Sequence, residues 1–427
     1  MNEQMIRKNN MKIYPAFQMF SWDLLFYYAI IFLFLTQVKG FTASQILIAD
    51  SFYAIFRIAF QIISISLIDS MGKQKSILLG NALVTISILL IILGNDLLFL
   101  IFAFFIQAIG YNLKGPCEPT ILSDSIPKSS FASTIYAKIY GKGTSYYYIF
   151  DAISSISTGF LYVINPYIPL ILCFICCLIS TILSLTFEDP AHIETTNNDD
   201  NKKSNFIENY KDMLITFKQI IKSNRLKLLL IYSLCFWAFF SVFGTLKSSI
   251  LVDLNVPEQY FGIIAAVCQI FSAISSKNYQ WFHKKLKNRA LTWFSLSLSS
   301  SFIIAGLVVI CDINYILSIT IVLLTRLFFG IIKGPYFTLM QKYLNSFSNS
   351  NVNTKIYAIK STLENAGRVL MSLFASFLLG ITNTSYAFVI IGSIFFIIFI
   401  FLLDSMKNKV GLRPEEYSEE DLIFSNE

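Results

Sequence analysis

The sequence is poor in charged residues, histidine and cysteine, and each shortage excludes a class of protein. Of its 427 residues, 14% are charged and two are histidine, whereas 55% are hydrophobic. A soluble chain carries about 25% charged residues, so this apolar excess requires lipid as the solvent. The 41 Phe and 22 Tyr argue against disorder, and 18 glycines and 7 cysteines are too few for collagen or a disulfide scaffold. The composition predicts a polytopic membrane protein.

The scarce residues also argue against enzyme chemistry. Cys173, Cys176 and Cys177 contain a C-x-x-C spacing, but no His accompanies them, and His192 and His283 lie in polar loops. A membrane-embedded enzyme would need a convergent His, Ser or metal set at membrane depth. The chain also lacks a phosphate-binding glycine loop, which argues against direct use of ATP. We expect no enzyme activity, no metal and no cofactor.

Long apolar runs predict an all-α membrane protein with twelve transmembrane helices. Each crossing needs about 20 mainly apolar residues, and the runs do not alternate in polarity as barrel strands do. The expected spans cover 13–35, 44–66, 76–95, 97–121, 134–161, 165–186, 228–250, 258–279, 289–310, 314–338, 355–381 and 385–404.

The distribution of Lys and Arg predicts the orientation, because basic loops stay in the cytoplasm. Basic residues gather at 73–75, 202–227, 284–289 and 407–413, and all these loops lie on one side of the expected topology. Both termini are then cytoplasmic. The net charge of +7 is a topology signal, so we expect no nucleic-acid partner.

A polar segment divides the chain into two sets of six spans. We expect an N-terminal six-helix bundle (1–187), a cytoplasmic linker (188–227), a C-terminal six-helix bundle (228–406) and a cytoplasmic tail (407–427). Within the linker, apolar residues from Phe206 to Ile221 recur at helical spacing opposite lysines. This pattern predicts either an amphipathic helix on the inner membrane surface or a plain linker with some helix.

The two halves repeat each other. Residues 107–116, QAIGYNLKGP, match residues 326–335, RLFFGIIKGP, 219 positions later. The tripeptide Ile-Tyr-Ala at 135–137 recurs at 356–358, an offset of 221, and Gly159 and Gly380 keep the same separation. Two agreeing offsets with matching helix order indicate two related, pseudo-symmetric six-helix bundles.

The loop between the second and third spans reads Asp69-Ser-Met-Gly72-Lys73-Gln-Lys75. With two six-helix halves and a long connector, it resembles the loop signature of the major facilitator superfamily of secondary transporters. The match is partial, because Ile65 and Ser70 replace a usual Gly and a usual basic residue, and residues 283–289 retain only basic charge. The resemblance implies a cytoplasmic gate at Asp69, Gly72, Lys73 and Lys75. Alternatively, the lysines merely follow the positive-inside rule.

Polar groups at membrane depth are costly and usually face an internal cavity. In the superfamily the first, fourth, seventh and tenth helices line the substrate path, which by resemblance favours Asp23, Gln107 and Arg326. Lys114 and Lys333 either point inward or extend to the cytoplasmic surface. A positive cavity weakly favours an anionic or polar solute. The expected cavity residues are Arg57, Gln107, Lys114, Trp237, Arg326 and Lys333.

Asp23, near the middle of the first span, is the first candidate for proton coupling, with Asp151 and Glu364 as substitutes. A carboxylate exposed in turn to different surroundings can gain and lose a proton. The alternative for Asp23 is a fixed ion pair with Arg57. For Glu364, Lys360 and Arg368 lie on the same helix face and can satisfy it locally.

These features predict a secondary active transporter that moves a small organic solute by alternating access, coupled to protons. An efflux carrier for drugs or antibiotics is the alternative, although no Pro follows Gly159 in the fifth span as in many drug antiporters of the superfamily. A membrane sensor with the transporter fold is the alternative of another class. The Ile-, Phe-, Lys- and Asn-rich composition suggests a bacterial plasma membrane. We expect a monomer in the lipid bilayer, with the solute and protons as partners.

Overall fold

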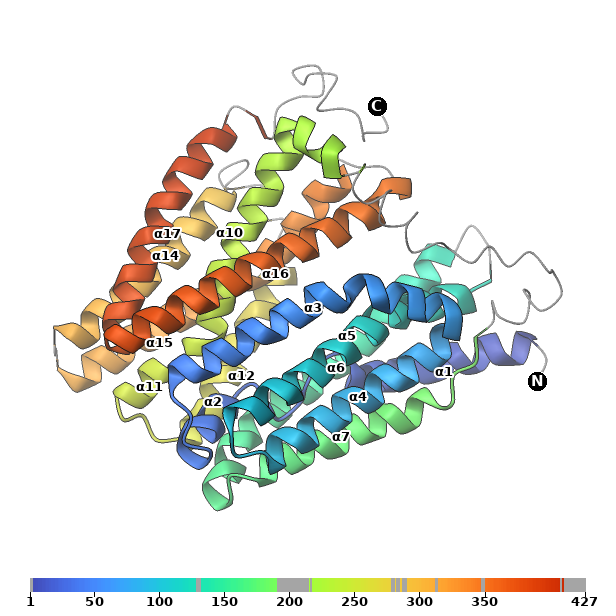
Figure 1. Cartoon of the computed structure of the whole chain (residues 1–427), viewed down its shortest axis with the longest axis horizontal. Helices are drawn as coiled ribbons and strands as arrows, with labels where there is room; N and C mark the ends of the chain where they lie inside the picture. The colour runs from blue at the N-terminus through green and yellow to red at the C-terminus, as the bar shows by residue number, and fades with distance from the viewer. Residues whose placement is uncertain are drawn as a thin grey trace. The chain divides into compact units, whose positions relative to one another are not determined.

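The computed structural model describes residues 3–127, 132–189, 217–277, 290–311, 314–346 and 350–407, together with 215, 281, 285 and 409–410 (Figure 1). The described residues form helices and no strand. Within these ranges, eight helices are long and apolar enough to cross a membrane, and two further apolar helices, Ile168–Ser184 and Gln259–Ser275, are shorter. The expected amphipathic helix and the C-terminal tail lie mostly outside the described residues.

The helix order follows the expected spans. The first half contains α1 (Glu3–Ser21), α2 (Ile31–Leu33), the π-helix η1 (Phe34–Val38), α3 (Ala43–Met71), α4 (Lys73–Leu93), α5 (Leu97–Ser125), α6 (Ala132–Ile164) and α7 (Ile168–Ser184). The second contains α10 (Asn224–Leu246), α11 (Ser249–Asp253), α12 (Gln259–Lys277), α14 (Ala290–Ile310), α15 (Tyr315–Ser346), α16 (Ser350–Ile381) and α17 (Thr384–Lys407). Eleven of the twelve expected ranges coincide with a continuous or nearly continuous helix.

The first span is the exception. Helix α1 ends at Ser21, and residues 22–30 form bends and turns before α2 begins. The Asp23 carboxylate accepts a hydrogen bond from the Leu24 amide at 2.9 Å, which offers the backbone an alternative to the helix. Phe26 adopts φ 59°, in the left-handed region. The expected continuous helix over 13–35 was therefore wrong, because a local side-chain bond replaces helical bonds at Asp23.

The chain folds into two compact units. The first holds residues 1–41, 52–209 and 258–266, and the second holds residues 42–51, 210–257 and 267–427. The beginning of α3 thus belongs to the second unit, and the beginning of α12 to the first.

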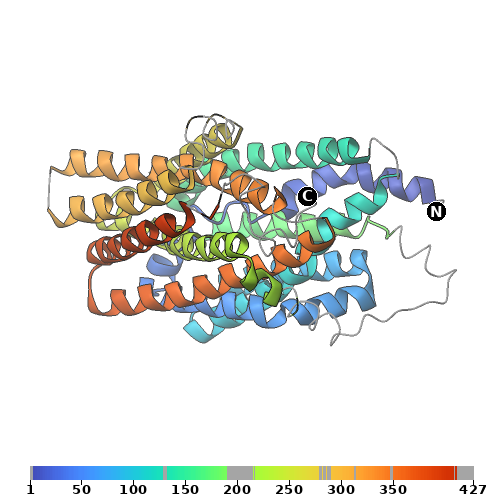
Figure 2. The same cartoon turned by 90° about the horizontal axis from the view of Figure 1, so that it is seen from above.

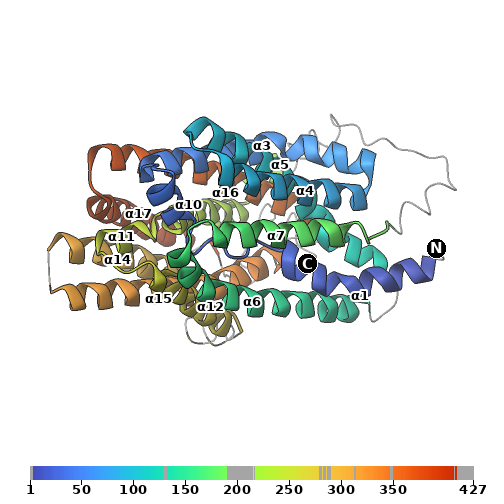
Figure 3. The same cartoon turned by 90° about the horizontal axis from the view of Figure 1, so that it is seen from below.

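In the first unit, α1 packs against α5, α6 and α7, and α4 packs against α5 and α7 (Figure 3). One cluster of this core holds Tyr14 and Phe17 of α1 against Phe187, with ring centroids 4.9 Å apart for Phe17 and Phe187. At the end of α4, Lys39 donates to the Ile92 carbonyl at 2.7 Å. Partial burial lowers the pKa of Lys39.

In the second unit, α14 packs against α15 and α17, and α10 packs against α16 and α17. α14 and α15 lie side by side as an antiparallel pair (Figure 2). Phenylalanine fills the space between the helices: the ring of Phe239 lies 4.6 Å from that of Phe302 and 4.9 Å from that of Phe395. Phe236 stacks on Tyr336 with centroids 3.6 Å apart.

Candidate functional site

The site in the first unit depends on a close crossing of α4 and α5. A Cβ atom added to Gly110 would lie 2.7 Å from the Gly80 carbonyl oxygen, and one added to Gly80 would lie 2.8 Å from Cβ of Lys114. Only glycine permits two helix backbones to come this close. The crossing places Lys114 of α5 beside Asn81 of α4.

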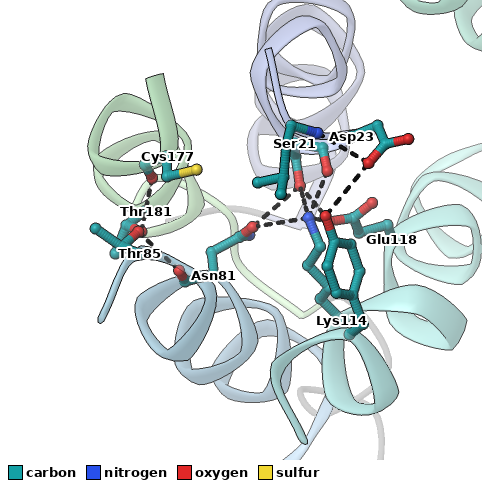
Figure 4. A network of polar contacts seen from close by, with 10 residues as sticks. Ser21, Asp23, Asn81, Thr85, Lys114, Glu118, Cys177 and Thr181 are labelled. Atoms are coloured by element: carbon teal, nitrogen blue, oxygen red, sulfur yellow. Dashed lines mark hydrogen bonds and ion pairs between the residues drawn. The ribbon is translucent and has the colours of Figure 1, made fainter. Parts of the chain in front are cut away.

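Lys114 lies at the centre of a buried polar network, 3% exposed (Figure 4). Its ammonium donates to the Ser21 carbonyl, to Ser21 Oγ at 3.1 Å and to Asn81 Oδ1 at 3.2 Å. Ser21 is the last residue of α1, so the ammonium satisfies a carbonyl at the negative end of the helix dipole. Lys114 points inward, and the alternative that it extends to the cytoplasmic surface was wrong.

Glu118 supplies the counter-charge. Its Oε1 lies 3.6 Å from Lys114 Nζ and accepts a hydrogen bond from Ser21 Oγ. The i,i+4 spacing of Lys114 and Glu118 places the two side chains on one face of α5. The network continues from Asn81 to α7 (Figure 4). The hydroxyl of Thr85 donates to the Asn81 backbone carbonyl at 2.8 Å, and it lies 3.0 Å from the hydroxyl of Thr181. The polar network around the Lys114–Glu118 pair therefore joins α1, α4, α5 and α7.

Asp23 lies in the interruption after α1, where tyrosines bind it. Its Oδ1 accepts from Tyr28 at 2.6 Å and from Tyr111 at 3.4 Å. Among the described residues Asp23 forms no ion pair with Arg57, so the fixed pair considered from the sequence was wrong. Arg57 lies over the Tyr111 ring, 6.0 Å from its centroid, and Lys114 Nζ lies 4.9 Å from the same centroid. Tyr111 thus links the carboxylate to two cations.

Two other expected site residues of the first unit are buried. Gln107 of α5 is buried and its Nε2 has no hydrogen-bond partner among the described residues. Asp151 of α6 is also buried and lies within electrostatic range of Tyr147 and Tyr148. Among the described residues, Gln107 forms no hydrogen bond to the Lys114 network.

In the second unit, Glu364 of α16 is held by near neighbours. Lys360 Nζ lies 2.6 Å from Glu364 Oε1, and Ser233 of α10 donates to the same oxygen. The local pairing of Lys360 and Glu364 was correctly predicted. Arg368, however, forms a bidentate pair with Asp50 at the beginning of α3, with Nε 2.9 Å from Oδ2.

Arg326, Trp237 and Lys333 also belong to the second unit. Arg326 of α15 is 6% exposed, and its Nη1 has no hydrogen-bond partner among the described residues. Trp237 of α10 stacks on Phe240, which stacks on Phe329 with centroids 4.5 Å apart. Lys333 is half-buried, two turns after Arg326. These side chains come from α10 and α15, the seventh and tenth expected spans.

In the loop that joins α3 to α4, Gly72 adopts φ 83°, a left-handed conformation that glycine adopts without steric cost. The Lys73 amide donates to Asp189 Oδ2 at 3.0 Å, and its ammonium pairs with Asp124. Lys75 is exposed. The side chain of Asp69 lies outside the described residues, so its expected gating contact stays a prediction.

Four polar residues of these networks were not among the expected site residues: Ser21, Asn81, Asp50 and Ser233. Asp50 and Asn81 carried a signal, since each lies inside an expected span where a polar group is costly. Ser21 and Ser233 carried none, because serine also satisfies itself within a helix. Among the described residues, no three His, Cys, Asp or Glu side chains lie together as metal ligands.

Solved structures with the same architecture are transporters. The chain is similar to the nucleoside transporter NupG (TM-score 0.71, 11% identity, 95% of this chain and 100% of that one). It is also similar to a bacterial homologue of the human lysosomal transporter Spinster (TM-score 0.66, 12% identity, 98% of both chains). A third similar structure is the peptide transporter POT (TM-score 0.63, 14% identity, 94% and 93%).

At the sequence level, no curated protein matches the chain. The family model of the Major Facilitator Superfamily matches residues 16–345, well over half of the length. The fold is therefore that of an all-α membrane transporter, and the chain belongs to the Major Facilitator Superfamily.

Proposed function

We propose that this protein is a secondary active transporter that moves a small organic solute by alternating access and couples the movement to protons. Membership of the superfamily supports the transport class. Buried or half-buried ionisable side chains in both units, among them Asp23, Lys114, Arg326 and Glu364, support a polar path through the protein.

The observation that carries the proposal is the interruption of the first span at Asp23. A broken helix at membrane depth is tolerated where it lines a cavity or is buried in protein. Asp23 is partly exposed, and Tyr28, which donates to it, is 46% exposed although both lie within the first span. These exposed fractions support our proposal that solute and protons reach this carboxylate.

Protonation of Asp23 changes the bonds that hold the interruption. The ionised carboxylate accepts from the Leu24 amide and from the hydroxyls of Tyr28 and Tyr111. All three donors bind Oδ1, and protonation of the carboxyl removes its negative charge, so these charge-assisted bonds weaken. Because Tyr111 lies between Asp23 and two cations, the change reaches Lys114 and Arg57 through one side chain. Asp151 and Glu364 remain the substitutes for this role.

The proposal also covers the class of solute, the membrane and the orientation of the chain in it. Similarity to transporters of nucleosides and of peptides suggests these two classes as the first solutes to screen. We place the protein as a monomer in the plasma membrane, with both termini in the cytoplasm and residues 188–227 linking two six-helix bundles. We propose that Asp69, Gly72, Lys73 and Lys75 act at the cytoplasmic gate.

A direct test begins with a thermal-shift screen, in which a ligand that binds only the folded state raises the melting temperature. In proteoliposomes containing a ligand from that screen, Asp23→Asn should abolish accumulation driven by a pH gradient while exchange continues. Asparagine keeps the size of the side chain but cannot carry a proton.

The matched control is Asp404→Asn, which removes an exposed carboxylate near the end of α17 and should leave accumulation intact. Full pH-driven accumulation by Asp23→Asn would refute the coupling role. A complete lack of counterflow for every ligand that binds would favour the sensor over the transporter.

A further inference from the structure

Arg326 is a buried guanidinium without a counter-ion. It is 6% exposed, and neither a hydrogen bond nor an ion pair of its side chain occurs among the described residues. The carboxylate on neighbouring α16, Glu364, is held by Lys360 and Ser233. An uncompensated charge inside a membrane protein is costly, and no described residue supplies an anion for this guanidinium.

Further positive charge surrounds the same place. The Cys268 thiol of α12 donates to the Arg326 carbonyl at 3.6 Å. Lys247, at the end of α10, and Lys333 of α15 lie within electrostatic range of the same thiol, as does Arg326. Three cations from α10 and α15 therefore act electrostatically on one thiol of α12. Charges of one sign in a low-dielectric setting concentrate ions of the opposite sign.

We propose that Arg326, with Lys247 and Lys333, forms an anion site in the second unit that binds a carboxylate or phosphate group of the transported solute. The guanidinium offers parallel N–H groups that match either oxyanion. The inference rests on the proposed transport function and narrows its substrate to solutes with an anionic group.

Cys268 is a native reporter of this site, because its half-buried thiol donates to the Arg326 backbone carbonyl and lies within electrostatic range of the Arg326 guanidinium. The unmodified protein is treated separately with an anionic and a cationic methanethiosulfonate of similar size, and labelling of the Cys268 peptide is followed by mass spectrometry. The ratio of anionic to cationic rates should fall at least about tenfold in Arg326→Gln, because the local positive charge is reduced. Arg326→Lys should retain most of the ratio.

Lys407→Gln is the matched control, since it removes one positive charge from an exposed position at the end of α17. It should leave the ratio unchanged. An equal ratio in the wild type and in a folded Arg326→Gln would overturn the site. Should Arg326→Gln fail to fold, the wild type alone decides: inorganic phosphate or acetate, at fixed ionic strength, must slow labelling of Cys268 by neutral N-ethylmaleimide, and choline or glucose must not.

Two further experiments distinguish a lipid head group from a solute as the source of the anion, and distinguish failure of the anion site from failure of the transport proposal. In nanodiscs, protection that appears only with phosphatidylglycerol and not with added phosphate or acetate would assign the site to a lipid head group and reject the solute. Counterflow of a neutral solute without any anion effect at Cys268 would reject the anion site and retain transport. An anion effect at Cys268 without counterflow of any solute would retain the anion site and reject transport.

Discussion

At the residue scale, substitution of Lys114 leaves several buried polar groups without a partner. Its ammonium satisfies the end of α1, the Asn81 oxygen and Glu118 at once. A buried pair contributes little net stability when complete, but removal of one partner strands the other charge and costs about 3–5 kcal/mol.

Lys114→Met should therefore destabilise the protein by about 3–5 kcal/mol, since Glu118 and the Ser21 carbonyl lose their partner. Adding Glu118→Gln to Lys114→Met removes the stranded charge and should recover part of this loss. Reversible unfolding in detergent measures the free energy of unfolding of both variants. Glu118→Gln alone completes the double-mutant cycle. Strictly additive effects would contradict a coupled pair.

The sequence predicted which residues of this site lie at membrane depth, but not where they point. The position of Lys114 in the inner third of its helix allowed both an inward and a cytoplasm-directed side chain. The choice depends on the Gly80–Gly110 crossing and on the buried backbone carbonyl at the end of α1, two features that exist only in the folded bundle. Likewise, Arg368 was expected to satisfy Glu364, whereas its partner Asp50 is 318 residues away in the sequence.

At the element scale, apolar length predicted the helices well. The expected spans 289–310 and 385–404 differ from α14 and α17 by at most three residues at each end. Hydropathy failed at residues 22–30, because an apolar run looks alike whether or not it is helical. The carboxylate of Asp23 was the available signal there.

The crossing of α4 and α5 gives a prediction with a control in the same helix. Gly110→Ala should lower the melting temperature, because the new Cβ would lie 2.7 Å from a carbonyl oxygen and overpacking costs about 1–3 kcal/mol. Gly115→Ala, one and a half turns further on, meets nothing within 4 Å and should be neutral or slightly stabilising. Equal melting temperatures for the two variants would contradict the close crossing.

The beginning of α3 and α16 form a second testable contact. Ser44 Oγ and Ser376 Oγ lie 2.8 Å apart, next to the pair of Asp50 with Arg368. Ser44→Cys with Ser376→Cys should form a disulfide under mild oxidation, since side chains this close meet the geometric requirement. The loss of two reactive thiols, counted by a maleimide gel shift, measures it; Ser44→Cys alone is the control, and failure to cross-link would exclude the contact.

At the scale of the whole molecule, the internal repeat does not produce equal contacts. In the first unit, Gly159 of α6 and Gly262 of α12 bring two backbones together: a Cβ atom on Gly262 would lie 2.1 Å from the Ser155 oxygen. In the second unit, polar and charged side chains join α3 and α16. Gly380, which repeats Gly159 in the sequence, has open space around it. The repeat thus predicts two related bundles, but it does not predict which contacts stabilise each unit.

The proposed topology predicts the reactivity of Cys311. This exposed cysteine follows α14, whose end faces outward if both termini are cytoplasmic. A membrane-impermeant maleimide added to intact cells should label Cys311. In a Cys311→Ser background, Ser405→Cys near the end of α17 should react only after the membrane is permeabilised. The reverse pattern would invert the topology.

The end of α1 has one more consequence. Where a membrane helix stops short, its free carbonyls commonly bind a dissociable metal cation such as sodium. Here an ammonium fixed to the chain occupies such a position, with Glu118 as its counter-ion. The cation at this helix end is covalently part of the protein, so it does not have to bind from solution and cannot dissociate together with a transported solute.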